Sequence, residues 1–198
     1  MTRRTKRDVV QEFRKSEILS AARTVFSRKG FHDATIDDIA ASAGLAKGTV
    51  YLYFKSKQEI YLAALRDGIE ALLRKMRADA EGPGTARDKL RRLIETKMAF
   101  FDENVDFFQI IQSELGRLDT TMNECRDLYF DQTRIIEDVL KAGIKEGAVR
   151  KLNTAKAAFA VADLTKGIVI QRTMGWSKTR LKGEVDFIFN LLWKGIST

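Results

Sequence analysis

The side chains best suited to chemistry in this sequence gather in one short segment, residues 44–57. They combine ammonium and hydroxyl groups with small residues, on a stretch whose apolar residues recur at helical spacing. Such groups can bind phosphate oxygens and the edges of nucleic acid bases, so they favour binding over catalysis. The candidate DNA-contacting residues in this segment are Ala46, Lys47, Gly48, Thr49, Tyr51, Tyr53, Lys55 and Lys57.

Two short helices are predicted to position these groups. Thr35 precedes a run of apolar residues at helical spacing and is followed three positions later by Asp38, so it can cap a helix over residues 36–43. Gly44 comes next, where glycine readily adopts the left-handed conformation that ends a helix. A second helix follows at once. Two helices joined by so short a turn form a helix-turn-helix, which places a recognition helix in the major groove of DNA.

The second helix is expected to be two-sided. Leu45, Val50 and Phe54 are predicted to face the core, which leaves the candidate side chains on the outer side. Ser56 is expected to cap a further helix that begins at Lys57. Lysines at a helix start are unfavourable for the helix dipole but suited to phosphate groups, so Lys55 and Lys57 are both expected to contact phosphate.

The stretch from Phe13 to Leu65 resembles the N-terminal domain of the TetR-type transcriptional regulators. The resemblance rests on residues 18–26 as a first helix, on Gly30-Phe31 at its exit, on Thr35 with Ile39-Ala40, and on residues 44–57. It implies a three-helix DNA-binding domain over residues 1–57. It also implies DNA contacts by Thr35, Lys47, Thr49, Tyr51, Tyr53 and Lys57. Tyr53 stands where the family often has histidine.

The charge distribution agrees with a nucleic acid partner. The chain has 198 residues and a net charge of +8, and residues 1–57 hold twelve Lys or Arg against six Asp or Glu. The basic excess therefore coincides with the predicted DNA-binding domain. The first basic residues, Arg3, Arg4, Lys6 and Arg7, show no apolar periodicity and are expected to form a mobile arm. Such an arm enters a minor groove, touches only phosphates, or is simply solvated.

Several other classes of protein are disfavoured. The sequence contains no apolar run of roughly 18 residues and no signal peptide, so a cytoplasmic protein without a membrane partner is expected. A single cysteine, Cys125, and a single histidine, His32, provide neither a disulfide nor a set of metal ligands, and no cofactor is expected. Phosphate-binding glycine loops and catalytic metal motifs are also missing, which argues against an enzyme. The alternative is an architectural protein that binds DNA without sequence preference.

Beyond Lys57 the pattern predicts helices almost throughout, hence an all-α fold of about nine helices. Residues 58–198 are expected to form a helical domain, for which the resemblance to the TetR-type regulators implies effector binding and dimerisation. A Gly-Pro-Gly break at residues 82–84 separates the first two helices of this domain. The predicted helices cover residues 59–79, 86–102, 105–118, 121–146, 154–175 and 181–196.

The resemblance implies a homodimer that binds a palindromic operator and releases it when a small molecule binds, most often as a repressor. Apolar residues in the last two predicted helices can form the contact between two copies or close the monomer core. A segment rich in phenylalanine suggests a hydrophobic or amphipathic effector, although the same rings could be ordinary core. The overall layout is similar to the fatty-acid-metabolism branch, whose effectors are acyl-CoA thioesters, and a multidrug-type ligand is the alternative. The candidate ligand-binding residues are Phe100, Phe101, Phe107, Phe108 and Ile111.

Overall fold

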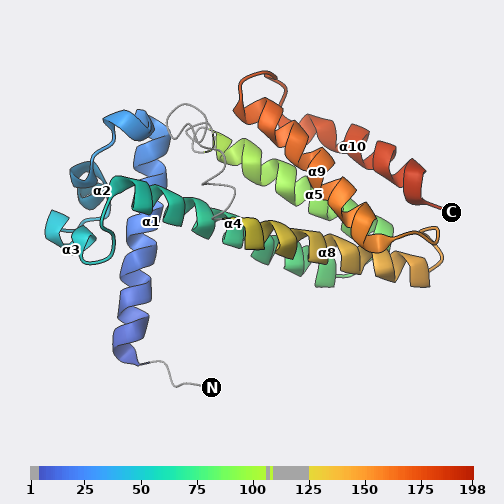
Figure 1. Ribbon diagram of the computed structural model, residues 1–198, viewed down its shortest axis with the longest axis horizontal. Helices are drawn as coiled ribbons and strands as arrows, with labels where there is room; N and C mark the ends of the chain where they lie inside the picture. Colours follow the sequence, from blue (N-terminus) through green and yellow to red (C-terminus); the bar gives the residue numbers. More distant parts are fainter. Residues whose placement is uncertain (1–4, 106–107, 109–124) are drawn as a thin grey trace. The chain divides into compact units, whose positions relative to one another are not determined.

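The computed structural model describes residues 5–105, 108 and 125–198 (Figure 1). Within these residues it contains eight α-helices, and the sole β feature is an isolated bridge between Val149 and Ser197. The all-α prediction is therefore confirmed. The predicted helix over residues 105–118 lies almost wholly outside the described part. None of the described helices is long and apolar enough to cross a membrane.

The chain divides into two compact units, which are described separately. The N-terminal unit contains described residues 5–68, and the C-terminal unit contains 69–105, 108 and 125–198. Helix α4, Lys57–Glu81, contributes its first part to the N-terminal unit and its remainder to the C-terminal unit.

The N-terminal unit consists of α1 (Lys6–Asp33), α2 (Ile36–Ser42), α3 (Lys47–Tyr51) and the first part of α4. Helix α2 packs against both α1 and α3. The buried side chains of α2, Ile39 and Ala40, are apolar and pack with those of the neighbouring helices into one small core. The most deeply buried side chains of the unit are Ile18, Ala22, Phe26, Ile39, Val50, Ile60, Tyr61, Ala64 and Leu65.

Helix α1 begins earlier than predicted. Thr5 accepts a hydrogen bond from the main-chain N–H of Asp8, and the Asp8 carboxylate accepts one from the Thr5 N–H, which completes a capping box. Lys6 and Arg7 therefore belong to a helix, and their assignment to a mobile arm was wrong. The helix is interrupted near its other end at Gly30, where φ is 75°.

The predicted caps at the starts of α2 and α4, and the predicted glycine turn after α2, are confirmed. Thr35 and Asp38 form a reciprocal capping box at the start of α2, and Gly44 adopts a φ of 66° after it. At the start of α4, the Ser56 hydroxyl accepts a hydrogen bond of 3.1 Å from the Glu59 N–H. Local side-chain chemistry therefore defines where α2 and α4 begin.

The C-terminal unit contains the rest of α4, with α5 (Ala86–Glu103), α8 (Arg126–Lys145), α9 (Thr154–Thr173) and α10 (Leu181–Ile196). Helix α5 packs against α8, α9 and α10, and α8 packs along α9 (Figure 1). Each of these helices matches a predicted one closely. Their shared core includes Leu73, Met76, Leu90, Leu93, Met98, Ile136, Leu140, Ala162, Leu181, Ile188 and Phe189.

One close approach in this unit requires glycine. A Cβ atom added at Gly143 of α8 would lie 2.6 Å from Cγ2 of Val149 and 2.9 Å from Cβ of Ala86. The absence of a side chain lets the end of α8 lie against the start of α5. Nearby, the Glu146 carboxylate accepts a hydrogen bond of 3.0 Å from the Ala86 N–H.

Candidate functional site

Helix α3 presents one buried and one accessible side, but it is shorter than the predicted second helix, because Leu45 and Phe54 lie outside Lys47–Tyr51. Val50 is fully buried and Phe54 is 2% exposed, whereas Leu45 is only half-buried. The α2–α3 turn is held by a main-chain hydrogen bond of 2.9 Å from the Leu45 N–H to the Ala40 carbonyl. Among the candidate DNA-contacting residues, Thr35, Ala46, Lys47, Gly48, Tyr51 and Lys55 are exposed, while Thr49, Tyr53 and Lys57 are partly buried.

Lys47 lies at the start of α3 and pairs with a carboxylate of α2. Its ammonium donates to Asp37 over 2.7 Å, and the two side chains are 51% and 63% exposed. The hydrogen bond to Asp37 raises the pKa of Lys47, so the group is fully charged at neutral pH. Because such an exposed ion pair contributes little stability, the ammonium can exchange Asp37 for a phosphate oxygen.

The capping carboxylate of α2 is held by several donors. Asp38 accepts from the Lys29 ammonium over 2.8 Å, and from both the N–H and the hydroxyl of Thr35. These bonds, with that from Lys29 the strongest, lower the pKa of Asp38 to about 2. Thr35 is thereby fixed at the entrance to the helix-turn-helix, with its side chain exposed.

Lys57 differs from the other candidate residues in its partners. Its ammonium donates to three main-chain carbonyls at the end of α1, those of Phe31 at 2.5 Å, His32 at 2.9 Å and Ala34 at 2.8 Å. The nitrogen also lies 4.6 Å from the centre of the Phe31 ring. Its phosphate contact stays a prediction. The hydrogen bonds to main-chain carbonyls suggest a different role for Lys57, within the DNA-binding unit itself.

One exposed side chain next to α3 was missed by the sequence analysis. Leu52 immediately follows the helix and is 82% exposed, and Tyr51 beside it is 48% exposed. An apolar side chain here can contact the methyl group of thymine. Its position two residues after the buried Val50 was the signal that could have identified it, because residues two apart lie on different sides of a helix.

Three of the predicted ligand-binding phenylalanines form a cluster in the C-terminal unit. The ring centres of Phe100, Phe101 and Phe108 lie 5.4, 5.8 and 4.6 Å apart in pairs, and Phe108 is 5% exposed. Phe100 and Phe101 pack against the shared core. The other two predicted residues, Phe107 and Ile111, lie outside the described residues, so the composition of a ligand cavity stays a prediction.

The C-terminal unit also contains buried polar groups. Lys97, one turn before Phe100 and Phe101, is 5% exposed and donates to the Thr165 hydroxyl over 2.8 Å and to the Ala162 carbonyl over 3.3 Å. Burial lowers the pKa of Lys97 to about 7. Within the described part of the chain, Nε2 of Gln132 and Nε of Arg172 are buried without a hydrogen-bond acceptor. Unsatisfied groups of this kind can bind the polar atoms of a ligand.

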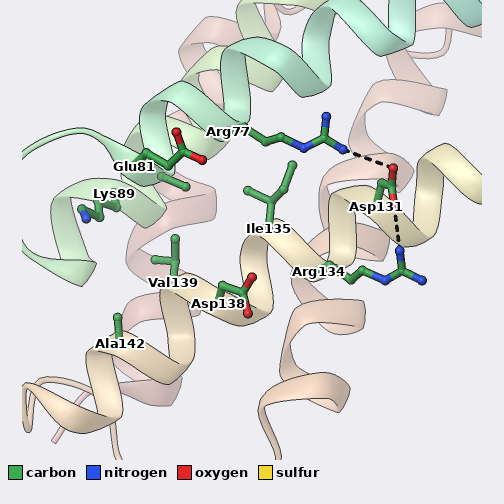
Figure 2. A pocket seen from close by; sticks show the side chains of 10 residues that line it. Arg77, Glu81, Lys89, Asp131, Arg134, Ile135, Asp138, Val139 and Ala142 are labelled. Atoms are coloured by element: carbon green, nitrogen blue, oxygen red, sulfur yellow. Dashed lines mark hydrogen bonds and ion pairs between the residues drawn. The ribbon is translucent and has the colours of Figure 1, made fainter. Parts of the chain in front are cut away.

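A groove of about 390 Å³ lies between α4, α5 and α8 of the same unit (Figure 2). Arg77 reaches from α4 to the Asp131 carboxylate of α8 over 3.2 Å, and Arg134 binds the same carboxylate over 2.9 Å. Six of its ten lining residues are charged, which does not match an apolar cavity. Phe100, Phe101 and Phe108 do not line it. The lining residues are Arg77, Ala80, Glu81, Lys89, Asp131, Arg134, Ile135, Asp138, Val139 and Ala142.

Comparison with known proteins reveals relatives over both units. The chain is 26% identical over 136 residues to the fatty acid metabolism regulator protein of Bacillus subtilis (strain 168), covering 68% of this chain and 70% of that protein. It is 28% identical over 148 residues to the HTH-type transcriptional repressor KstR2 of Rhodococcus jostii (strain RHA1), covering 74% of this chain and 72% of that protein.

Solved structures share the fold. The transcriptional regulator FadR from Bacillus subtilis, solved in complex with stearoyl-CoA, superimposes with a TM-score of 0.75 at 24% identity. The match covers 91% of this chain and 98% of that one.

Profiles of known families match the helix-turn-helix and the helical region after it separately. The profile of the bacterial regulatory proteins, tetR family, matches residues 18–64, and that of the tetracyclin repressor-like C-terminal domain matches residues 83–170. The first match contains the capped α2, the Gly44 turn and α3, on which Lys47, Gly48 and Tyr51 are exposed and Val50 is buried. With both profiles in their expected order, the chain belongs to the TetR family of bacterial transcriptional regulators.

Proposed function

We propose that this regulator is a cytoplasmic homodimeric repressor that binds a palindromic operator through residues 1–57 and is released by a hydrophobic or amphipathic effector bound within residues 58–198. The observation that carries the proposal is the accessible side of α3. Lys47 and Tyr51 are exposed there, while Val50 anchors the same short helix in the core. A rigid helix with donor groups on its free side can read base edges, whereas charge alone gives no sequence preference.

Exposed apolar side chains on α9 and α10 support the homodimer. Phe159 of α9 is 36% exposed, and Phe187 and Leu191 of α10 are 64% and 54% exposed. Burying such groups against a second copy is favourable, and a two-fold axis lets each copy use the same surface. Two recognition helices about 34 Å apart would then read two half-sites one turn of DNA apart.

We assign the effector to the class of long-chain acyl-CoA thioesters, with a multidrug-type hydrophobic ligand as the alternative. Support comes from the relative named as a fatty acid metabolism regulator and from the similar structure solved with stearoyl-CoA. In this chain, Phe100, Phe101 and Phe108 provide apolar rings for an acyl chain. Phe107 and Ile111 are assigned to the same cavity.

Release requires that the effector bind one conformation of the dimer more tightly than the other. In the proposed mechanism, the effector favours a dimer in which the recognition helices no longer match adjacent major grooves. The operator and the effector then bind with opposing preferences, and each weakens the affinity of the other by the same factor.

DNA recognition is tested by selecting genomic fragments with the purified protein at near-physiological salt and sequencing those that it retains. The proposal predicts a shared palindrome in the retained fragments. Retention without any shared sequence would contradict it and would favour the second candidate, an architectural protein that binds DNA nonspecifically. The observation in favour of that second candidate is the concentration of basic residues in residues 1–57.

The effector class is tested on the selected operator by titrating stearoyl-CoA, with free CoA and stearate as matched controls. We expect stearoyl-CoA to release the protein and free CoA to leave the complex intact. Phe101→Ala should weaken the response to stearoyl-CoA without changing operator affinity. Equal release by a panel of unrelated hydrophobic compounds would instead support the multidrug alternative.

A further inference from the structure

Three main-chain carbonyls converge on a single ammonium group in the N-terminal unit. They belong to Phe31, His32 and Ala34, which are 23 to 26 positions away from Lys57 in the sequence. Their distances to the Lys57 nitrogen, 2.5 to 2.9 Å, are those of charge-assisted hydrogen bonds. The Phe31 ring covers the nitrogen from another side, 4.6 Å from its centre.

The local backbone explains why these carbonyls are available. At Gly30 the chain takes φ 75° and ψ 176°, which interrupts the regular hydrogen bonding of α1. The last carbonyls of a helix find no donor within that helix, and those that follow an interruption need donors from elsewhere. A cation at the C-terminal end of a helix also complements the helix dipole.

The number of donors matters for function. A lysine ammonium has three N–H groups, and in Lys57 the three carbonyls account for all three. A phosphate oxygen could bind this ammonium only by displacing a carbonyl, which would be left without a donor. Lys55, two residues earlier, is exposed, and its main-chain N–H donates to the Glu59 carboxylate over 2.7 Å.

The contact joins the two elements that flank the helix-turn-helix. Lys57 is the first residue of α4, and its acceptors lie at the end of α1, directly before the Thr35 cap of α2. Two further contacts join the same helices. Tyr61 of α4 packs its ring on those of Phe26 and Phe31, with centres 5.5 and 5.7 Å away, and Arg23 pairs with Asp67 over 2.6 Å.

We infer that Lys57 is a positioning residue of the DNA-binding unit: it binds the carbonyls at the end of α1 rather than DNA phosphate, and so fixes the point at which the chain enters α2. The inference rests on the proposed DNA-binding function. Of the two lysines predicted to contact phosphate near this helix start, it keeps only the exposed Lys55.

The test compares Lys57→Met, Lys57→Arg and the control Lys55→Met in the full-length protein. Melting temperature is measured without DNA, and operator affinity is measured at about 20 °C, where the variants are folded, over a range of salt concentrations. Lys57→Met should lower the melting temperature by about 3 °C and the affinity about tenfold, with the salt slope unchanged. Lys55→Met should keep the melting temperature and lower the slope by about one.

Lys57→Arg distinguishes further between a contact with the main-chain carbonyls and a contact with DNA phosphate. Its planar guanidinium does not fit an acceptor set built around a compact ammonium, so it should behave like Lys57→Met. If Lys57→Met does not fold, Lys57→Gln, which keeps two N–H donors, replaces it with the same expectations.

Two results would overturn the inference. A Lys57→Met variant with wild-type melting temperature and a slope lowered by about one, together with a wild-type-like Lys57→Arg, would establish a phosphate contact. A lowered melting temperature with wild-type affinity at the same temperature would reduce Lys57 to a structural role. If the wild-type protein binds no DNA, the proposed function fails, and an unchanged melting temperature in Lys57→Met then overturns the carbonyl contact on its own.

Discussion

The two units of this regulator differ in where their polar side chains lie, at the surface in one and partly in the core in the other. Among the described residues, all buried polar or charged side chains except Tyr61 lie in the C-terminal unit: Lys97, Gln132, Thr133, Thr165 and Thr173. In the N-terminal unit the ion pairs and capping carboxylates lie at the surface, around an apolar core. A unit that reads DNA needs a rigid scaffold with donors outside, whereas a unit that encloses a ligand needs polar atoms inside.

The difference has an energetic consequence. Buried polar groups lower the stability of a fold unless a partner satisfies them, and a bound ligand recovers part of that loss. The C-terminal unit should therefore gain more stability from an effector than the N-terminal unit could.

The largest effect is expected at Lys97. Because its pKa is about 7 when folded, against 10.5 for a fully solvated lysine, the unfolded chain binds the extra proton between these values, and the free energy of unfolding rises with pH across that range. Lys97→Met removes the buried charge and should raise the free energy of unfolding by roughly 3 to 5 kcal/mol near pH 7. Denaturant unfolding at a series of pH values from about 7 to 9 should show this gain shrinking as pH rises. A gain that is independent of pH would contradict the account.

The second largest effect, on operator affinity, is expected on the accessible side of α3. Tyr51 is 48% exposed, so Tyr51→Ala should leave the melting temperature unchanged. If its ring and hydroxyl contact the operator, the variant should lose roughly 1 to 3 kcal/mol of binding free energy, about tenfold or more in affinity. Gel-shift titration of wild type and variant on the same fragment measures this loss. Wild-type affinity in the variant would remove Tyr51 from the interface.

Helix capping should have similar effects in both units. Thr35 and Thr85 both form capping boxes, with Asp38 and Asp88 respectively. Thr35→Ala and Thr85→Ala should each lower the free energy of unfolding by about 1 kcal/mol, since caps act locally. Thermal unfolding of the two variants in parallel measures this. A loss in one unit several times that in the other would mean that the caps also carry tertiary contacts.

The smallest effect is expected at Arg23, the counterpart of Lys97 in the N-terminal unit. Arg23 pairs with Asp67 over 2.6 Å, with side chains 28% and 34% exposed. Arg23→Met should lower the free energy of unfolding by less than about 1 kcal/mol, because partly exposed ion pairs contribute little. The same kind of substitution would thus have opposite signs in the two units. Urea unfolding measures this change. A loss of free energy well above 1 kcal/mol would show that the Arg23–Asp67 pair stabilises the contact between α1 and α4 more than a partly exposed ion pair is expected to.

Sequence reasoning succeeded where structure is determined locally. The Thr35 cap, the Gly44 turn and the Ser56 cap each depend on residues three or fewer positions apart, and the helices from α4 to α10 follow from apolar spacing. It failed at the start of α1, where the Thr5 and Asp8 capping box lies among basic residues that were assigned to an arm.

Contacts between distant positions were beyond the sequence pattern. The acceptors of Lys57 are 23 to 26 residues away and are main-chain atoms, which no pattern of side chains encodes. The burial of Lys97 depends on Thr165, 68 residues away, and lysine is ordinarily a surface residue. The predicted ligand-binding residues share this difficulty, because a cavity is defined by helices that meet only in the folded chain.

The central claim is that the accessible side of α3 reads DNA sequence. It is tested most directly by measuring the dissociation constant of wild type and of the Thr49→Ala/Tyr51→Ala double variant, at one salt concentration, on the selected operator and on a scrambled fragment of equal length. The account predicts that wild type prefers the operator by about a thousandfold or more and that the double variant loses most of this preference while retaining its binding to scrambled DNA. A wild-type ratio near one, or an unchanged ratio in the double variant, would contradict it.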